Sequence, residues 1–278
     1  MSSKVPQITL NNGVEMPQLG FGVWQVPDDE AEQAVSTALE AGYRSIDTAA
    51  IYGNEEGTGK ALASSGVPRQ DIFVTTKLWN GDQGYDSTLR AFDASLAKLG
   101  LDYVDLYLIH WPLPARDRYV DTYKAFEKLL ADGRARAIGV SNFLPEHLER
   151  LIGETSVVPA VNQIELHPHL QQQASREFHA ARGIATEAWS PLGQGKGLLE
   201  VPAIVAIARK HERTAAQVVL RWHLQLGNVV IPKSVTPSRI AENIDVFDFS
   251  LDDEDLAAIS ALNEDRRIGP DPGTFDVA

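Results

Sequence analysis

Short apolar stretches alternate with amphipathic stretches along the chain. The apolar stretches are bounded by glycine or polar residues, which is typical of buried strands, and the segments between them carry apolar residues at helical spacing. The predicted strands are residues 19–23, 43–48, 71–77, 104–110, 136–141, 160–165, 184–190 and 229–232.

A helix is predicted after each strand. Two helices follow the seventh strand, and a further helix follows the one after the eighth. The predicted helices are residues 29–40, 55–64, 87–99, 119–131, 145–152, 172–181, 202–210, 215–226, 238–245 and 253–262. Asn54 is a candidate cap for the helix that follows the turn at Gly53. Residues 7–16 are expected to form a β-hairpin in which Asn12 and Gly13 supply positive φ angles.

Eight strands alternating with helices, without a linker or a break in composition, indicate one α/β domain with a parallel sheet over residues 1–278. The fold class predicted is a (β/α)8 TIM barrel with an N-terminal β-hairpin and extra helices after strand 7 and after helix 8. The alternative is an open doubly wound sheet. The count of eight strands favours the barrel, and Gly20-Phe21-Gly22 lacks the third glycine of a dinucleotide-binding fingerprint.

The composition narrows the possible partners and compartments. A formal net charge of −13 argues against nucleic acid or an anionic membrane as a partner. With no cysteine, disulfides and thiolate metal sites are excluded. Residues 1–6 lack the apolar run of a signal peptide, and no segment approaches the length of a membrane span. We therefore expect a soluble, cytoplasmic monomer.

Four polar residues fall at or just after the carboxyl ends of predicted strands, where a barrel carries its chemistry: Asp47, Tyr52, Lys77 and His110. One such residue is more often structural, but several at one rim favour a catalytic site. The group suits proton delivery to a carbonyl. A lysine ammonium favours the phenolate, so it makes a tyrosine a better proton donor. Asp47 can orient Lys77, and His110 can bind the substrate oxygen.

Five segments closely resemble the aldo-keto reductases, and the resemblance extends from about residue 8 to residue 262. The segments are DTAAIYGNE (47–55), LYLIHWP (106–112), GVSNF (139–143), NQIELHP (162–168) and IPKS (231–234). Compact bacterial members such as the 2,5-diketo-D-gluconate reductases look most similar. The resemblance implies that Tyr52 is the general acid and that Asp47, Lys77 and His110 complete its tetrad.

The resemblance also implies an NADPH site across the rim. It assigns the nicotinamide carboxamide to Ser141, Asn142 and Gln163, and the stacking on its ring to Trp189. The remaining implied cofactor positions are Gly22, the pyrophosphate loop with Ser190, Pro191, Leu192 and Gln194, the 2′-phosphate group with Lys233, Ser234, Val235 and Arg239, and the adenine contacts Glu242 and Asn243. A helix that begins after Thr236 would add a favourable amino-terminal dipole for the phosphate.

The sequence His167-Pro168-His169 raises the possibility of a zinc site, because His-x-His at a strand end can bind metal. Only His167 fits the resemblance, and no acid cluster or cysteine supplies further ligands. We expect no metal.

Trp24, Trp79 and Trp111 each follow a strand and could wall a substrate pocket. The loop after Trp111 and the tail after Leu262 are short, which predicts a shallow, open pocket. Such a pocket favours small polar carbonyls: aldehydes, α-dicarbonyls and keto sugars.

The sequence therefore predicts NADPH-dependent reduction of such carbonyls to alcohols by hydride transfer. Two alternatives remain open at this point. One is a Schiff-base aldolase, which would need an uncharged Lys77; the other is a non-catalytic nucleotide-sensing partner protein.

Overall fold

Eight parallel strands lie side by side in the order in which they occur along the chain. The structure is a computed structural model that describes residues 5–278. The absence of a signal peptide is inferred from residues 1–6, of which residues 1–4 lie outside the described residues. The strands are β3 (Phe21–Gly22), β4 (Ser45–Asp47), β5 (Phe73–Leu78), β6 (Val104–Ile109), β7 (Ala135–Ser141), β8 (Val161–Glu165), β9 (Ala185–Trp189) and β10 (Val229–Val230). The predicted strands are confirmed within a few residues at each end.

The segment that leads into β3 is joined to the last strand, β10, by backbone hydrogen bonds and a parallel bridge between Leu19 and Val230. Val230 N donates to Gln18 O at 3.1 Å, and Gly20 N donates to Val230 O at 2.8 Å. The sheet therefore closes into a barrel, as the alternation of strands and helices predicts. An open doubly wound sheet is excluded by this closure.

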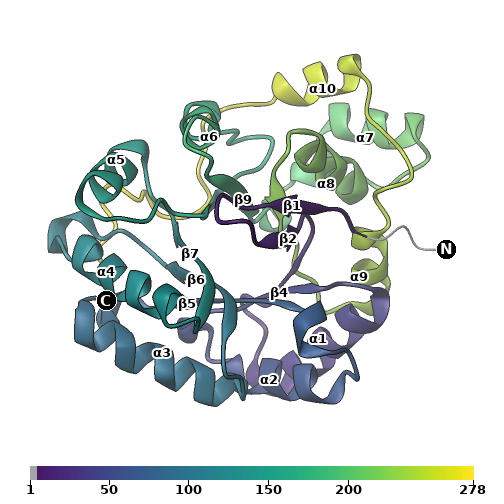
Figure 1. Cartoon of the computed structure of the whole chain (residues 1–278). Coiled ribbons are helices and arrows are strands. Elements are labelled where there is room, and N and C mark those ends of the chain that lie inside the picture. Colours follow the sequence, from purple (N-terminus) through teal and green to yellow (C-terminus); the bar gives the residue numbers. More distant parts are fainter. Residues whose placement is uncertain (1–4) are drawn as a thin grey trace.

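Helices surround the strands (Figure 1). They are α1 (Asp28–Ala41), α2 (Glu55–Ser64), α3 (Tyr85–Leu99), α4 (Tyr119–Ala131), α5 (Pro145–Glu154), α6 (Gln173–Ala180), α7 (Pro202–Lys210), α8 (Ala215–Gln225), α9 (Pro237–Ile244) and α10 (Asp253–Ser260). Helices α7 and α8 both follow β9, and α10 follows α9, which confirms the predicted extra helices. Within residues 5–278, none of the helices combines the length and the apolar character needed to cross a membrane.

Six short 3₁₀ helices lie in the connections of the described chain. They are η1 (Ala50–Tyr52), η2 (Arg69–Asp71), η3 (Asn80–Asp82), η4 (Pro114–Arg116), η5 (Gly193–Gly195) and η6 (Leu198–Glu200). Three of them, η1, η3 and η4, follow the carboxyl ends of β4, β5 and β6. The loops that surround the barrel mouth are therefore partly ordered by local hydrogen bonds.

An antiparallel hairpin, β1 (Gln7–Thr9) with β2 (Glu15–Pro17), covers the amino end of the barrel. Its apolar side chains Leu10 and Met16 are buried in one cluster with Phe73 at the start of β5. Of the two turn residues predicted to have positive φ, only Gly13 does (84°). The side chain of Asn12 instead accepts a hydrogen bond from Val14 N at 3.2 Å. With the amino end covered, the carboxyl end of the barrel is left for the site.

Candidate functional site

The four residues predicted to form the catalytic site come together at the carboxyl end of the barrel. Asp47 ends β4, Lys77 lies near the end of β5, and His110 directly follows β6. Tyr52 is the last residue of η1, before a turn at Gly53 with φ of 68°. Because β4, β5 and β6 are parallel neighbours, their ends meet at the same rim.

Lys77 and Asp47 form a buried ion pair. Lys77 Nζ donates to Asp47 Oδ1 at 2.6 Å and to the Thr48 carbonyl oxygen at 2.9 Å, and the Lys77 side chain is 0% exposed. Burial is the largest single effect on the pKa of Lys77 and lowers it, but the Asp47 carboxylate, Tyr52 and Glu187 together outweigh burial, so the pKa is raised above its usual value. A lysine held charged in this way opposes the Schiff-base aldolase alternative, which needs a neutral amine.

The Tyr52 phenol lies beside this pair. Lys77 Nζ is 5.1 Å from the centroid of the Tyr52 ring. Burial raises the pKa of Tyr52 above its ordinary value and outweighs the lowering by the Lys77 ammonium. Lys77 lowers the pKa of the phenol, as expected from the sequence, but the rise caused by burial is larger. The phenol therefore carries its proton at neutral pH.

His110 completes the group through ring contacts. Its imidazole stands edge-on to the Tyr52 ring, with centroids 5.7 Å apart, and edge-on to Trp79 at 5.4 Å. Burial, and after it the Lys77 ammonium, lowers the pKa of His110 well below its usual range. The imidazole is therefore neutral at pH 7, with one N–H available to donate a hydrogen bond.

Asn54 does not cap α2 with its side chain. Its amide instead donates to Val23 O at 2.9 Å and Val26 O at 2.8 Å, and its Oδ1 accepts from Thr48 Oγ1 at 2.7 Å. The predicted position of Asn54 before the first residue of α2 is confirmed, but a capping bond from its side chain is absent. The residue holds the loop after β3 against the strand that carries Asp47.

The carboxamide candidates form one hydrogen-bonded network with Trp189. Ser141 Oγ donates to Gln163 O at 2.8 Å, and Asn142 Nδ2 donates to His110 O at 3.0 Å. Asn142 Oδ1 accepts from the Trp189 indole N–H at 2.8 Å. The network links the end of β9 to the backbone of the candidate catalytic histidine.

Gln163 also leads to a residue that the sequence analysis missed, Glu187 on β9. Gln163 Nε2 donates to Asp47 Oδ2 at 2.9 Å and to Glu187 Oε2 at 2.8 Å. Burial, followed by the nearby Asp47 carboxylate, raises the pKa of Glu187 to about 8. An acid within the apolar stretch 184–190 is the sequence signal that could have identified it.

The other positions implied to hold the cofactor lie along one arc of the rim, from β9 through α9 to β3. They are Ser190, Pro191, Leu192 and Gln194 after β9, Lys233, Ser234, Val235, Arg239, Glu242 and Asn243 before or within α9, and Gly22 in β3. The helix begins at Pro237 as predicted, although the Thr236 side chain makes no capping bond. Lys233 and Arg239 are exposed beside this helix start.

Gly22 has a packing role within this arc. Its amide donates to Pro232 O at 3.1 Å, and a Cβ at this position would lie 3.2 Å from Ile231 O. Only glycine lets the first and eighth strand segments come this close without adjustment.

The three tryptophans differ in their surroundings. Trp24 is 40% exposed, Trp79 packs edge-on against His110, and Trp111 is only 7% exposed. Trp111 is covered by Phe275 of the carboxy-terminal tail, whose ring centroid is 4.4 Å away. The tail, although short as predicted, therefore contributes to the wall of the mouth.

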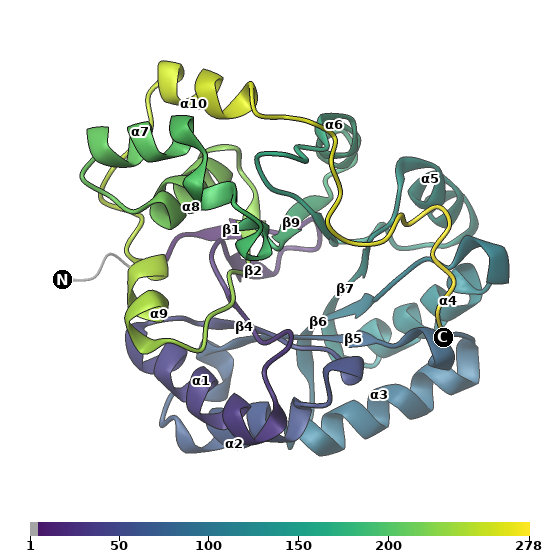
Figure 2. The same ribbon diagram turned by 180° about the vertical axis from the view of Figure 1, so that it is seen from behind.

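The tail runs from α10 past α6 and α5 and ends beside α4 (Figure 2). The buried carboxylate of Glu165 holds it, accepting hydrogen bonds from Ile268 N at 2.5 Å and Gly269 N at 2.9 Å. Glu165 also accepts from His167 Nε2 at 2.9 Å. His167 is thus engaged in fastening the tail, and residues 5–278 contain no His, Cys, Asp and Glu group arranged to hold a metal.

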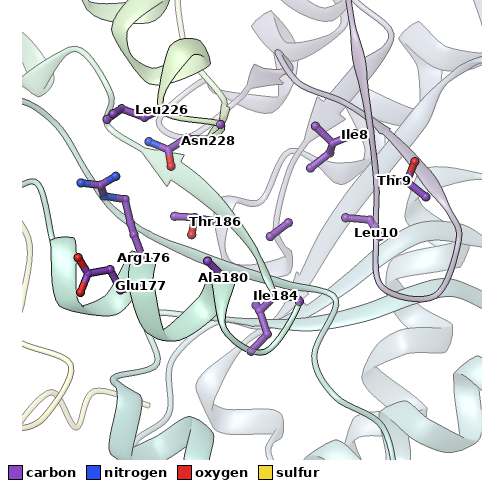
Figure 3. Close-up of a pocket in the computed structure, with 13 residues that line it drawn as sticks. Ile8, Thr9, Leu10, Arg176, Glu177, Ala180, Ile184, Thr186, Leu226 and Asn228 are labelled. Atoms are coloured by element: carbon purple, nitrogen blue, oxygen red, sulfur yellow. The ribbon is translucent and has the colours of Figure 1, made fainter. Parts of the chain in front are cut away.

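A groove of about 440 Å³ lies at the opposite end of the barrel, between the hairpin, α6 and the start of β10 (Figure 3). Its charged side chains already have partners within the chain. Arg176 Nε donates to Gln171 O, and Glu177 accepts from Gln173 Nε2. It carries none of the candidate catalytic groups, and we assign it no chemistry.

Comparisons with known proteins agree with this geometry. A sequence model of the Aldo/keto reductase family matches residues 17–264. The chain is 64% identical over 271 residues to an aldo-keto reductase of Mycolicibacterium smegmatis, covering 98% of each. It is 54% identical over 266 residues to the glyoxal reductase of Bacillus subtilis, covering 95% of each. A solved structure of a Gox0644 mutant in complex with NADPH matches with a TM-score of 0.95 and 53% identity, covering 99% of this chain and 100% of that one.

Proposed function

The chain belongs to the aldo/keto reductase family, and we propose that it uses NADPH to reduce small aldehydes, α-dicarbonyls or keto sugars to alcohols, with Tyr52 as the general acid. One observation carries this proposal: a buried Asp47–Lys77 ion pair lies beside a protonated Tyr52 and a neutral His110. These groups can protonate a carbonyl oxygen while its carbon is reduced.

The residues divide the proton transfer among them. Tyr52 donates its phenolic proton to the substrate oxygen, and the Lys77 ammonium stabilises the phenolate that remains. Asp47 keeps Lys77 charged and oriented. His110, neutral because it is buried, donates a hydrogen bond to the same oxygen and so selects its position.

Two observations support the binding of NADPH at this rim. Gln163 Oε1 accepts no hydrogen bond from residues 5–278, so it can accept one from the carboxamide N–H₂. Lys233 and Arg239 lie exposed near the amino end of α9, where they suit the 2′-phosphate. Bound NADPH supplies the hydride.

The proposed substrate class has two supports. The glyoxal reductase of Bacillus subtilis, with which this chain shares 54% identity, is named for an α-dicarbonyl. The mouth is lined by aromatic groups of which Trp24 is well exposed. A partly open aromatic mouth suits small polar carbonyls.

The test is Tyr52→Phe, which keeps the ring and removes the transferable proton. Turnover of methylglyoxal, followed as loss of NADPH absorbance, should fall by about 10²–10⁴-fold. The Kd for NADPH, measured by quenching of tryptophan fluorescence, should stay within about twofold of wild type because the ring still fills its place.

Tyr85→Phe is the matched control, since Tyr85 is exposed on α3. It should behave as wild type in both measurements. Near wild-type turnover by Tyr52→Phe would show that another group supplies the proton.

A further inference from the structure

The side chain of Gln163 is held in one orientation by two carboxyl groups. Both bonds use the same nitrogen: Nε2 donates to Asp47 Oδ2 and to Glu187 Oε2. The Asp47 carboxylate can only accept a hydrogen bond, so rotating the amide by half a turn would place Gln163 Oε1 against this acceptor and lose the bond to Asp47. The orientation leaves Gln163 Oε1 as the free end.

Glu187 is suited to this role by its position. It is the register neighbour of Gln163 on the adjacent strand and is 0% exposed. Its Oε2 accepts from Gln163, and its Oε1 has no hydrogen-bond partner within residues 5–278. Burial and the Asp47 carboxylate raise the pKa of Glu187 to about 8, while Gln163 and Lys77 lower it. At neutral pH it is a carboxylic acid that still accepts through Oε2.

We propose that Glu187 is a positioning residue of the reductase: together with Asp47 it orients the Gln163 amide so that the carbonyl oxygen of Gln163 faces the nicotinamide carboxamide. This inference rests on the proposed function. The resemblance to the aldo-keto reductases assigns no role to Glu187, and its effect on the cofactor passes through Gln163.

The same acid affects the proton donor through charge. The titratable groups near it are Asp47, Lys77 and Tyr52. While Glu187 is neutral, the buried Asp47–Lys77 pair carries no net charge. When Glu187 ionises, the cluster gains one negative charge, and this raises the pKa of Tyr52 further. A less acidic phenol slows protonation of the substrate, so reduction should decline as the pH rises through about 8.

The first test compares Glu187→Leu with Glu187→Gln by NADPH titration at pH 6.5, using tryptophan fluorescence, which needs no turnover. Leucine removes one of the two acceptors that hold the Gln163 amide and leaves only the bond to Asp47, so the Kd should rise about 5- to 30-fold. Glutamine offers Oε1 as an acceptor in the same place and should restore the Kd to within about threefold of wild type. Equal Kd values for wild type and the leucine variant, both folded by circular dichroism, would overturn the inference.

The second test uses only the glutamine variant, so it does not depend on whether the leucine variant folds. In wild type, turnover of methylglyoxal should fall as the pH rises through about 8 and then level off at the lower rate of the enzyme with ionised Glu187. Glu187→Gln cannot ionise, and its decline should begin at least one pH unit higher. An unchanged decline would overturn the charge effect.

Glu55→Gln is the matched control. Glu55 is also a buried glutamate, but it lies on α2; one oxygen accepts from Thr76, and the other has no hydrogen-bond partner in the described chain and lies 4.0 Å from Lys98 Nζ. Its substitution should leave the pH profile unchanged. Wild type that neither binds NADPH nor reduces any carbonyl would overturn the proposed function and this inference together. Normal wild-type activity with unaffected Glu187 variants would overturn this inference alone.

Discussion

Gly269 is the position at which the tail should affect cofactor binding. Its amide is fastened to the Glu165 carboxylate, and a Cβ at this residue would lie 2.6 Å from Trp189 Cη2 and 3.1 Å from Glu165 Oε2. The φ of Gly269 is not in the left-handed region, so alanine brings no backbone strain. Gly269→Ala therefore tests whether the tail sets the position of the Trp189 ring.

The expected effect of Gly269→Ala on stability and on NADPH affinity follows from these contacts. Carbon atoms pack at about 3.5–4.0 Å, so the added methyl requires a displacement of about 1 Å. If the ring tilts, its 2.8 Å bond to Asn142 Oδ1 is lost; if the tail retreats, its bonds to Glu165 stretch. Overpacking of this kind costs about 1–3 kcal/mol. If the ring takes up the strain, NADPH should bind about 5- to 150-fold more weakly.

The assay is NADPH titration by tryptophan fluorescence, with thermal unfolding to report the overall fold. Gly273→Ala is the matched control in the same tail, because its nearest contacts would be an ordinary 3.4 Å to Asp271 Oδ1 and 3.6 Å to Leu144 Cδ1. It should bind NADPH as wild type does. Wild-type affinity in Gly269→Ala, with an unchanged melting temperature, would refute the view that the tail positions a stacking Trp189.

Three further predictions follow from the site. Lys77→Met should lower turnover by at least about 100-fold and the free energy of unfolding by about 3–5 kcal/mol, because it leaves the Asp47 carboxylate buried without its cation; steady-state kinetics and urea unfolding measure both. Arg239→Ala should weaken the binding of NADPH at least about fivefold more than the binding of NADH. The control Arg90→Ala, on the exposed face of α3, should change the affinity for neither cofactor. Equal losses of affinity for both cofactors would refute the assignment of Arg239 to the 2′-phosphate. Because the pKa of Glu187 is raised in the folded protein, its bound proton stabilises the fold fully below the unfolded pKa of about 4.5, and this contribution is lost as the pH rises through about 8. The free energy of unfolding of wild type should therefore fall between these two pH values by up to about 5 kcal/mol more than that of Glu187→Gln. Urea-unfolding free energies that change in parallel for the two proteins would contradict this prediction.

Much of the fold could be read from local pattern. Helices α4 and α7 begin and end at the predicted residues, and the eight strands lie where the apolar stretches are. Periodicity determines this, because a segment with one buried face can pack in few ways. The gathering of Asp47, Lys77 and His110 also followed from sequence, since parallel strands bring their carboxyl ends to one rim. That these residues catalyse the reaction remains a prediction.

The tertiary structure alone determines which side chains contact residues that are distant in the sequence. Asn54 has the chemistry of a helix cap, yet it binds the loop after β3. Glu187 reads as one acid in an apolar strand until closure of the barrel brings Gln163 and Asp47 beside it. The tail is short and polar in sequence, but it places Phe275 over Trp111. Local pattern records which face of a segment is buried; the identity of a partner that is a hundred residues away depends on how the whole chain closes.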